Sequence, residues 1–149
     1  MSTEAENLIV ELHRTFPVSR ERLFAAWTEP KEMSQWFGPE GVRVLEARMD
    51  ARPDGKFLIS ATGAAGEIWN AIGEYREVTP PSRLVFTWAW ADIPEWQGID
   101  SVVTVEFAEK SEGAEVHLTH ERFPSADSRG RHEIGWTGSL EKLGSFLAT

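Results

Sequence analysis

The stretch RHEIGWTGSLEKLGSFL, residues 131–147, is the longest helical pattern in the chain. Its large apolar residues recur at i, i+4, i+7 and i+11, which places them in one stripe along a helix. They are Trp136, Leu140, Leu143 and Leu147. A helix of this length spans roughly 25 Å. The sequence therefore predicts a long C-terminal helix with a single apolar face.

Residues 41–121 alternate between apolar and polar side chains with a period of two, which is typical of strands. Turn signals divide this region, and the clearest of them is Asp54-Gly55. The predicted strands lie near residues 42–49, 56–61, 68–78, 83–90, 103–107 and 116–120. Because short turns join most of the consecutive strands, the pattern predicts an antiparallel meander of six strands.

Residues 8–16 predict one further strand, which Pro17 ends. Ser19 then stands as the N-cap of a short helix, and Pro30 opens a second short helix. No repeat or linker divides the chain, so residues 1–149 are expected to form a single domain. A sheet with one apolar face must be covered, and only the C-terminal helix is long enough to cover it. The expected fold class is α+β, a curved antiparallel sheet around that helix.

Two segments carry predictions about orientation or mobility. In the strand at 42–49, the charged side chains of Glu46 and Arg48 are expected to face solvent. The inward side chains would then be those of Leu45, Ala47 and Met49. The polar segment 125–131 is expected to be flexible.

The loop at residues 92–100 is longer than an ordinary hairpin connection. Its apolar residues are Ile93, Trp96 and Ile99. One hypothesis is that the loop forms a lid or a partner contact. The other is that it forms a rim that packs onto Trp36 and Phe37.

The composition excludes several classes of function. With 15 Lys and Arg against 24 Asp and Glu, the formal net charge is −9 at pH 7, which disfavours a nucleic-acid partner. The absence of cysteine excludes disulfides, thiolate metal sites and a cysteine nucleophile. No apolar run approaches the roughly 20 residues of a membrane span, and the acidic N-terminus does not resemble a secretory signal. A cytoplasmic location is expected.

Five blocks of the sequence carry a family resemblance. They are FPVSRERLFAAWTEPKEMSQWFGP (16–39), DARPDGKF (50–57), GEYREVTPPSRLVFTW (73–88), LTHERFP (118–124) and HEIGWTGSLEKLGSFL (132–147). In this order they resemble the Hsp90 ATPase activator homologue 1-like (AHSA1-like) family of the START/Bet v 1-like SRPBCC superfamily. The resemblance implies a helix-grip fold, in which a seven-stranded sheet clasps the C-terminal helix over a largely apolar cavity. The pattern departs at residues 52–55, where two glycines are usual and this chain has Arg-Pro-Asp-Gly.

Such a cavity needs rigid walls. At about 24 cal/mol per Å³, a void of about 300 Å³ would cost about 7 kcal/mol, so it persists only between stiff side chains or around an occupant. The seven Trp and eight Phe residues supply stiff side chains. The predicted cavity residues are Trp69, Tyr75, Phe86, Trp88, Trp90, Phe107, His120, Trp136 and Leu140. The alternative is that these rings simply fill the core.

His120 is the candidate polar residue of the cavity, because it shares a strand face with Val116 and Leu118. There it could orient a ligand or transfer a proton; the alternative is a histidine bonded to backbone at the wet end of the strand. His117 lies on the opposite face and His13 is isolated in sequence, so no metal site is expected. The chain has no phosphate-loop or dinucleotide-binding motif, and no cofactor is expected.

Three functions are consistent with these patterns. Non-enzymatic binding of a small hydrophobic or amphipathic molecule, such as a lipid, ranks first, because spacing alone places no catalytic pair. The second is a cyclase- or dehydratase-type enzyme in which His120 acts as acid or base. The third is a protein-interaction module, either co-chaperone-like or a homodimer formed through exposed aromatic surface.

Overall fold

The computed structural model describes residues 8–149. The chain runs through β1 (Ile9–Phe16), α2 (Arg20–Thr28), α3 (Pro30–Trp36), β2 (Arg43–Met49), β3 (Lys56–Thr62), β4 (Ile68–Thr79), β5 (Arg83–Trp90), η1 (Pro94–Trp96), β6 (Ser101–Lys110), β7 (Gly113–Glu121) and α4 (Ala126–Leu147). The element η1 is a single 3-10 turn. Over the described range, no helix combines the length and the apolarity needed to cross a membrane.

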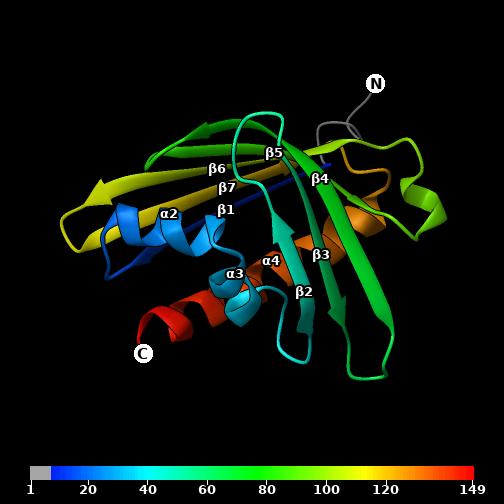
Figure 1. The fold of residues 1–149 in the computed structure, drawn as a ribbon, viewed down its shortest axis with the longest axis horizontal. Helices are drawn as coiled ribbons and strands as arrows, with labels where there is room; N and C mark the ends of the chain where they lie inside the picture. Colours follow the sequence, from blue (N-terminus) through cyan, green and yellow to red (C-terminus); the bar gives the residue numbers. More distant parts are fainter. Residues whose placement is uncertain (1–7) are drawn as a thin grey trace.

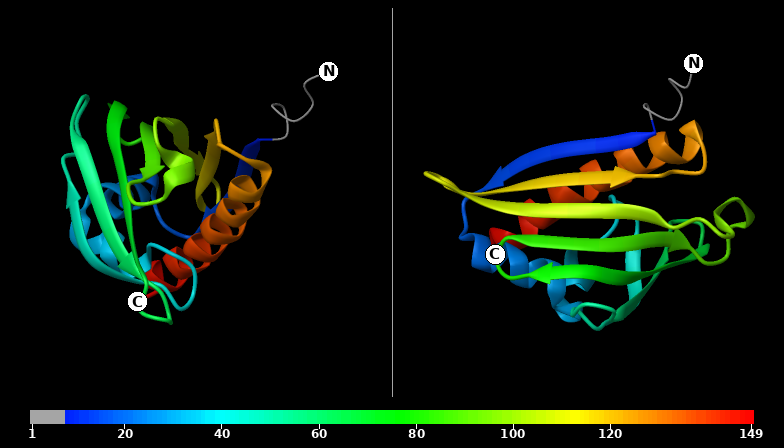
Figure 2. Two further views of the ribbon diagram at one scale, coloured as in Figure 1. Left: turned by 90° about the vertical axis from the view of Figure 1, so that its right-hand side faces the viewer. Right: turned by 90° about the horizontal axis from the view of Figure 1, so that it is seen from above.

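All seven strands belong to one antiparallel sheet, in the order β1-β7-β6-β5-β4-β3-β2. Strands β2 to β7 form the predicted meander, and β1 pairs with β7 at one edge. The sheet is strongly curved, and α4 runs diagonally across its concave side (Figures 1 and 2). The predicted α+β class and the helix-grip arrangement are confirmed.

The alternating patterns place one face of each strand in the core. On β6 and β7 the inward side chains are almost completely buried. They are Ser101, Val103, Val105 and Phe107 on β6, and Ala114, Val116, Leu118 and His120 on β7. The outward side chains between them are at least partly exposed. A period of two therefore predicts correctly which side of these strands is buried.

The two short helices close one end of the curved sheet. The Ser19 side chain caps α2 by accepting a hydrogen bond from the backbone N–H of Arg22, at 3.1 Å. Pro30 occupies the first turn of α3. Trp27 and Trp36 are buried, with ring centroids 4.8 Å apart, so the two helices pack against each other through indole rings.

Helix α4 begins earlier than the sequence predicts. Ser125 is its N-cap and accepts a hydrogen bond from the backbone N–H of Ser128, at 3.1 Å. The segment expected to be flexible, 125–131, forms the cap and first turns of this helix. The apolar stripe begins only at Trp136, so the early turns show no apolar signal; the capping serine is the signal that marks the start.

Strand β2 changes face at a bulge, where its register with β3 shifts between Val44 and Glu46. Val44 packs against the core, and after the bulge so do Ala47 and Met49. The predicted inward position of Leu45 is wrong, because this residue lies at the bulge and is 46% exposed. Glu46 is exposed, as expected, and so is Arg48.

The loop between β5 and β6 packs onto the start of α4. Trp96 is buried, and its ring centroid lies 5.3 Å from that of His132 and 6.3 Å from that of Phe123. The Ser128 hydroxyl donates to the Glu95 carboxylate at 2.6 Å, which ties the loop to α4. The loop thus packs as a rim, and its contacts with α4 and Phe123 are ones that the sequence does not predict.

Candidate ligand-binding pocket

A pocket of about 280 Å³ lies between α4 and the curved sheet, and we call it the α4 pocket. Its walls come from α4, from β3, β4 and β5, from the segment after α3, and from the rim loop. The lining residues are Phe37, Gly38, Pro39, Val42, Ala61, Trp69, Trp88, Trp90, Ile93, Arg131, His132, Gly135, Trp136 and Ser139. Most of this lining is aromatic or aliphatic.

The predicted cavity residues divide among three places. Those that line the α4 pocket are Trp69, Trp88, Trp90 and Trp136. Tyr75 and Phe86 line a separate hollow of only about 20 Å³, deeper in the core. Phe107, His120 and Leu140 are buried but line neither space. Strand parity predicts the buried face, but the position along the strand decides whether a side chain reaches the pocket.

His132 also lines the pocket and is not among the predicted cavity residues. Its Nδ1 lies 2.7 Å from the carbonyl oxygen of Ser128, which can only accept, so Nδ1 carries the ring proton. Its Nε2 accepts hydrogen bonds from the indole N–H groups of Trp90, at 2.8 Å, and Trp88, at 3.3 Å. His132 precedes Trp136 by four residues, so an extension of the apolar stripe by one turn would have found it.

His120 is fully buried, and its ring is also held by hydrogen bonds to both nitrogens. Its Nδ1 accepts the indole N–H of Trp136 at 3.0 Å, and its Nε2 lies 2.8 Å from the Ser101 hydroxyl. An indole N–H only donates, so the neutral ring carries its proton on Nε2 and donates to Ser101. That hydroxyl donates to the carbonyl oxygen of Trp88. Every polar atom in this chain of bonds has a partner.

Burial keeps both of these imidazoles neutral. Desolvation lowers the pKa of His132 to about 4, and the nearby Arg131 guanidinium acts in the same direction. Desolvation also holds the pKa of the His120 imidazole well below its ordinary value, with a smaller contribution from His132. The two ring centroids are 5.3 Å apart. Protonation of either ring would place a charge in an aromatic environment.

The pocket walls consequently present aromatic faces and few free polar groups. The indole N–H groups of Trp88, Trp90 and Trp136 all point to imidazole nitrogens. The Ser139 hydroxyl accepts from the backbone N–H of Gly38 and donates to the carbonyl of Gly135, both at 2.9 Å. The charged group of the lining is the Arg131 guanidinium, whose side chain is 68% exposed.

Two glycines of α4 shape the pocket. A Cβ atom at Gly135 would meet nothing within 4 Å, so this glycine leaves open space in the wall. A Cβ atom at Gly138 would lie only 2.7 Å from the Cβ of Pro39. Gly138 therefore lets the helix approach the segment after α3 closely, while Gly135 leaves room one turn earlier.

Comparison with known proteins places this geometry in a family. Residues 17–148 match the family described as Activator of Hsp90 ATPase homolog 1-like protein. A crystal structure of an AHSA1 protein from Silicibacter pomeroyi is similar, with 32% identity, a TM-score of 0.85 and coverage of 94% of this chain and 97% of that one. A protein from Chromobacterium violaceum shows 27% identity, a TM-score of 0.84 and coverage of 93% and 95% respectively. A search of curated proteins found no match.

The fold and its covered concave face define a helix-grip protein of the SRPBCC type. Within that class, the chain belongs to the Activator of Hsp90 ATPase homolog 1-like family, since the match covers nearly the whole sequence. The resemblance predicted from the five sequence blocks is confirmed.

Proposed function

We propose that this protein binds a small hydrophobic or amphipathic molecule in the α4 pocket without transforming it. The observation that carries the proposal is the lining, in which four tryptophans surround a space of about 280 Å³ and three of their N–H groups are already bonded to histidines. Such walls offer stacking and dispersion contacts. They favour a ligand whose body is apolar.

A charged residue at the edge of the pocket favours a ligand with a polar end. Arg131 lies at the edge of the pocket, with its Nη2 3.8 Å from the Glu95 carboxylate. An exposed pair at this distance is weak, so the guanidinium is free to turn to an anionic group at the pocket mouth. An aromatic or aliphatic body with an acidic or polar end is the ligand class that fits.

The enzymatic alternative depends on His120 as an acid or base. Both nitrogens of that ring are bonded within the protein, and the ring does not line the α4 pocket. Proton transfer requires a titrating group within hydrogen-bond reach of the substrate. This geometry favours binding over proton transfer.

A fluorescent probe tests the proposal. Anilinonaphthalene sulfonate has an aromatic body and one anionic group, and its emission rises in apolar surroundings. The Gly135→Leu variant would fill the pocket from its open wall, whereas Gly130→Leu adds the same side chain to the same helix outside the pocket, also into open space. We expect saturable binding to the unchanged protein and to Gly130→Leu. For Gly135→Leu we expect an affinity at least about tenfold lower.

Equal probe binding by both variants, with native circular dichroism, would overturn the proposal. Native mass spectrometry of gently purified protein adds a second measurement. A co-purifying small mass that Gly135→Leu lacks supports the pocket. A partner chain or a dimer without any small mass supports the protein-interaction alternative instead.

A further inference from the structure

A second group of chemically active side chains lies on the outer face of the sheet, away from the α4 pocket. Glu11 and His13 project from β1, and His117 projects from β7. The register of the two strands pairs His13 directly with His117. The sequence alone predicts no metal site, because His13 is isolated along the chain, but strand pairing brings it beside a second histidine.

The donor atoms of these three residues converge. The Nε2 atom of His117 lies 2.7 Å from the Glu11 carboxylate, and the Nε2 atom of His13 lies 3.6 Å from the same oxygen. The imidazole rings are stacked, with centroids 4.0 Å apart and planes inclined by 15°. One donor atom from each residue lies within 4.8 Å of the other two. Donors on a tetrahedral Zn²⁺ are about 3.3 Å apart, given bonds of about 2.0 Å.

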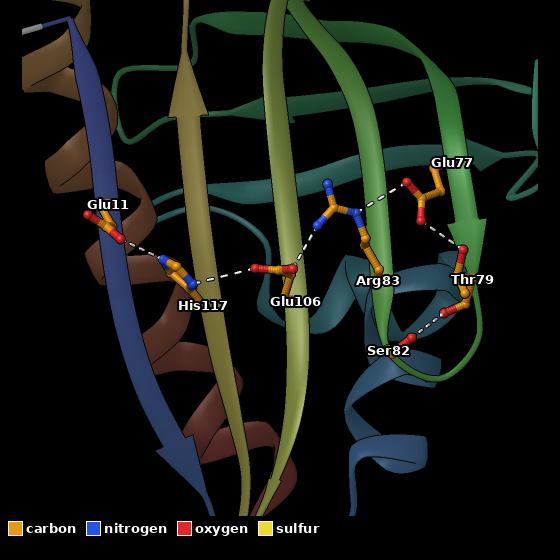
Figure 3. A network of polar contacts seen from close by, with 7 residues as sticks. All are labelled: Glu11, Glu77, Thr79, Ser82, Arg83, Glu106 and His117. Atoms are coloured by element: carbon orange, nitrogen blue, oxygen red, sulfur yellow. Dashed lines mark hydrogen bonds and ion pairs between the residues drawn. The ribbon is translucent and has the colours of Figure 1, made fainter. Parts of the chain in front are cut away.

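The far side of each ring also faces a carboxylate. The Nδ1 atom of His117 lies 3.6 Å from Glu106, and the Nδ1 atom of His13 lies 3.9 Å from Glu115. Figure 3 shows Glu11, His117 and Glu106 in one line across the outer face. Metal-binding histidines commonly donate their second ring N–H to such a group, which fixes the tautomer and increases ligand basicity.

The neighbouring charges leave the cluster negative. Arg83 bonds Glu106 at 2.6 Å, and Lys110 lies 3.8 Å from Glu115. These two cations face three carboxylates, those of Glu11, Glu106 and Glu115, so the groups around the two histidines carry a net negative charge. The whole chain has a formal net charge of −9, which also favours association with a cation.

We propose that Glu11, His13 and His117 form a binding site for a divalent transition-metal ion of the Zn²⁺ type. Two imidazole nitrogens and one carboxylate oxygen supply three ligands, and water completes the coordination. The bound ion joins the edge strand β1 to β7. The site is independent of the α4 pocket, so either proposal can fail without the other.

Zinc titration of tag-free protein tests this site. With imidazole resonances followed by NMR, ZnCl₂ should shift the side-chain signals of His13 and His117. The buried His120 and the half-buried His132 serve as internal controls and should not move. Calorimetry should give one ion per chain.

Variants at exposed positions separate this site from diffuse binding to surface carboxylates. His13→Asn and His117→Asn should each lower the zinc affinity at least about tenfold. Glu109→Gln removes an exposed carboxylate outside the cluster and should leave the affinity unchanged. The proposal is overturned if the two histidine signals stay in place in excess Zn²⁺, or if the histidine variants bind the ion as tightly as the unchanged protein.

Discussion

A pair of neighbouring histidines lies on each side of the sheet, and the two pairs differ in the groups that their ring nitrogens contact. His120 and His132 have ring centroids 5.3 Å apart inside the aromatic core, and their nitrogens bond to neutral groups. His13 and His117 are stacked at 4.0 Å on the outer side, and their nitrogens face carboxylates.

This contrast shows that surroundings, and not residue type, set what a histidine does. Inside, desolvation keeps the imidazole neutral, and the ring serves as an acceptor that orients indole N–H groups. Outside, the rings and carboxylates are accessible and present a donor set to solvent. The inner pair organises the pocket wall, whereas the outer pair is available to a cation.

The largest expected effect comes from removal of the Trp136 ring, through which α4 contacts the sheet. Trp136→Ala deletes a buried side chain and the hydrogen-bond donor to His120 Nδ1. We expect the free energy of unfolding to fall by about 3–5 kcal/mol, measured by urea denaturation. Ile134→Ala on the same helix is the control, because Ile134 is 72% exposed and its loss should change stability by less than about 0.5 kcal/mol. Equal costs would break the contrast between the closed inner side and the open surface.

A pH series sharpens the comparison. The pKa of His132 is lowered to about 4 in the folded state, whereas histidine in the unfolded chain has a pKa of about 6.5. Below pH 6.5 the folded state therefore binds fewer protons than the unfolded chain. Stability is therefore lost as the pH falls through that window. Between pH 7 and 5, His132 should remove about 2 kcal/mol from the free energy of unfolding, and His120 acts in the same direction.

Urea denaturation at several pH values measures this loss, and Ile134→Ala provides the control. That variant changes an exposed side chain and no titratable group, so its pH dependence should match that of the unchanged protein. A stability that stays flat from pH 7 to 5 would contradict the neutral state of the inner pair.

The third expected effect, similar in size to the second, concerns a single hydroxyl group of the inner network. Ser101→Ala removes the acceptor of the His120 Nε2–H and leaves a buried donor without a partner. We expect a loss of about 1–3 kcal/mol in the free energy of unfolding. The exposed Ser111→Ala is the matched control and should be close to neutral. A loss for Ser101→Ala no greater than that of the control would show that solvent reaches His120.

Much of the fold could be predicted because its signals are local. Alternation along β5 predicted the bounds Arg83–Trp90, and Ser19 predicted the start of α2. The bulge in β2 could not be predicted, because one extra residue reverses which side chains point to the core and no change in composition marks it. Leu45 was assigned to the wrong side for that reason.

The pocket was less predictable than the fold. Trp69, Trp88, Trp90 and Trp136 line the α4 pocket, because large aromatic side chains on inward positions reach far across the interior. Phe107 shares the inward direction but packs against α2, where its ring lies 5.7 Å from that of Phe24. Whether an inward-pointing ring lines the pocket therefore depends on which element packs against it.

Periodicity and composition alone determined that this chain forms a curved antiparallel sheet covered by a C-terminal helix, because the spacing of apolar residues selects strand or helix and its buried face. Tertiary structure decided which nitrogens bond to which partners. Trp136 reaches His120 only because α4 packs on the sheet, and His13 meets His117 only because the register of β1 and β7 pairs them. The chemistry of both sides of the sheet rests on those long-range contacts.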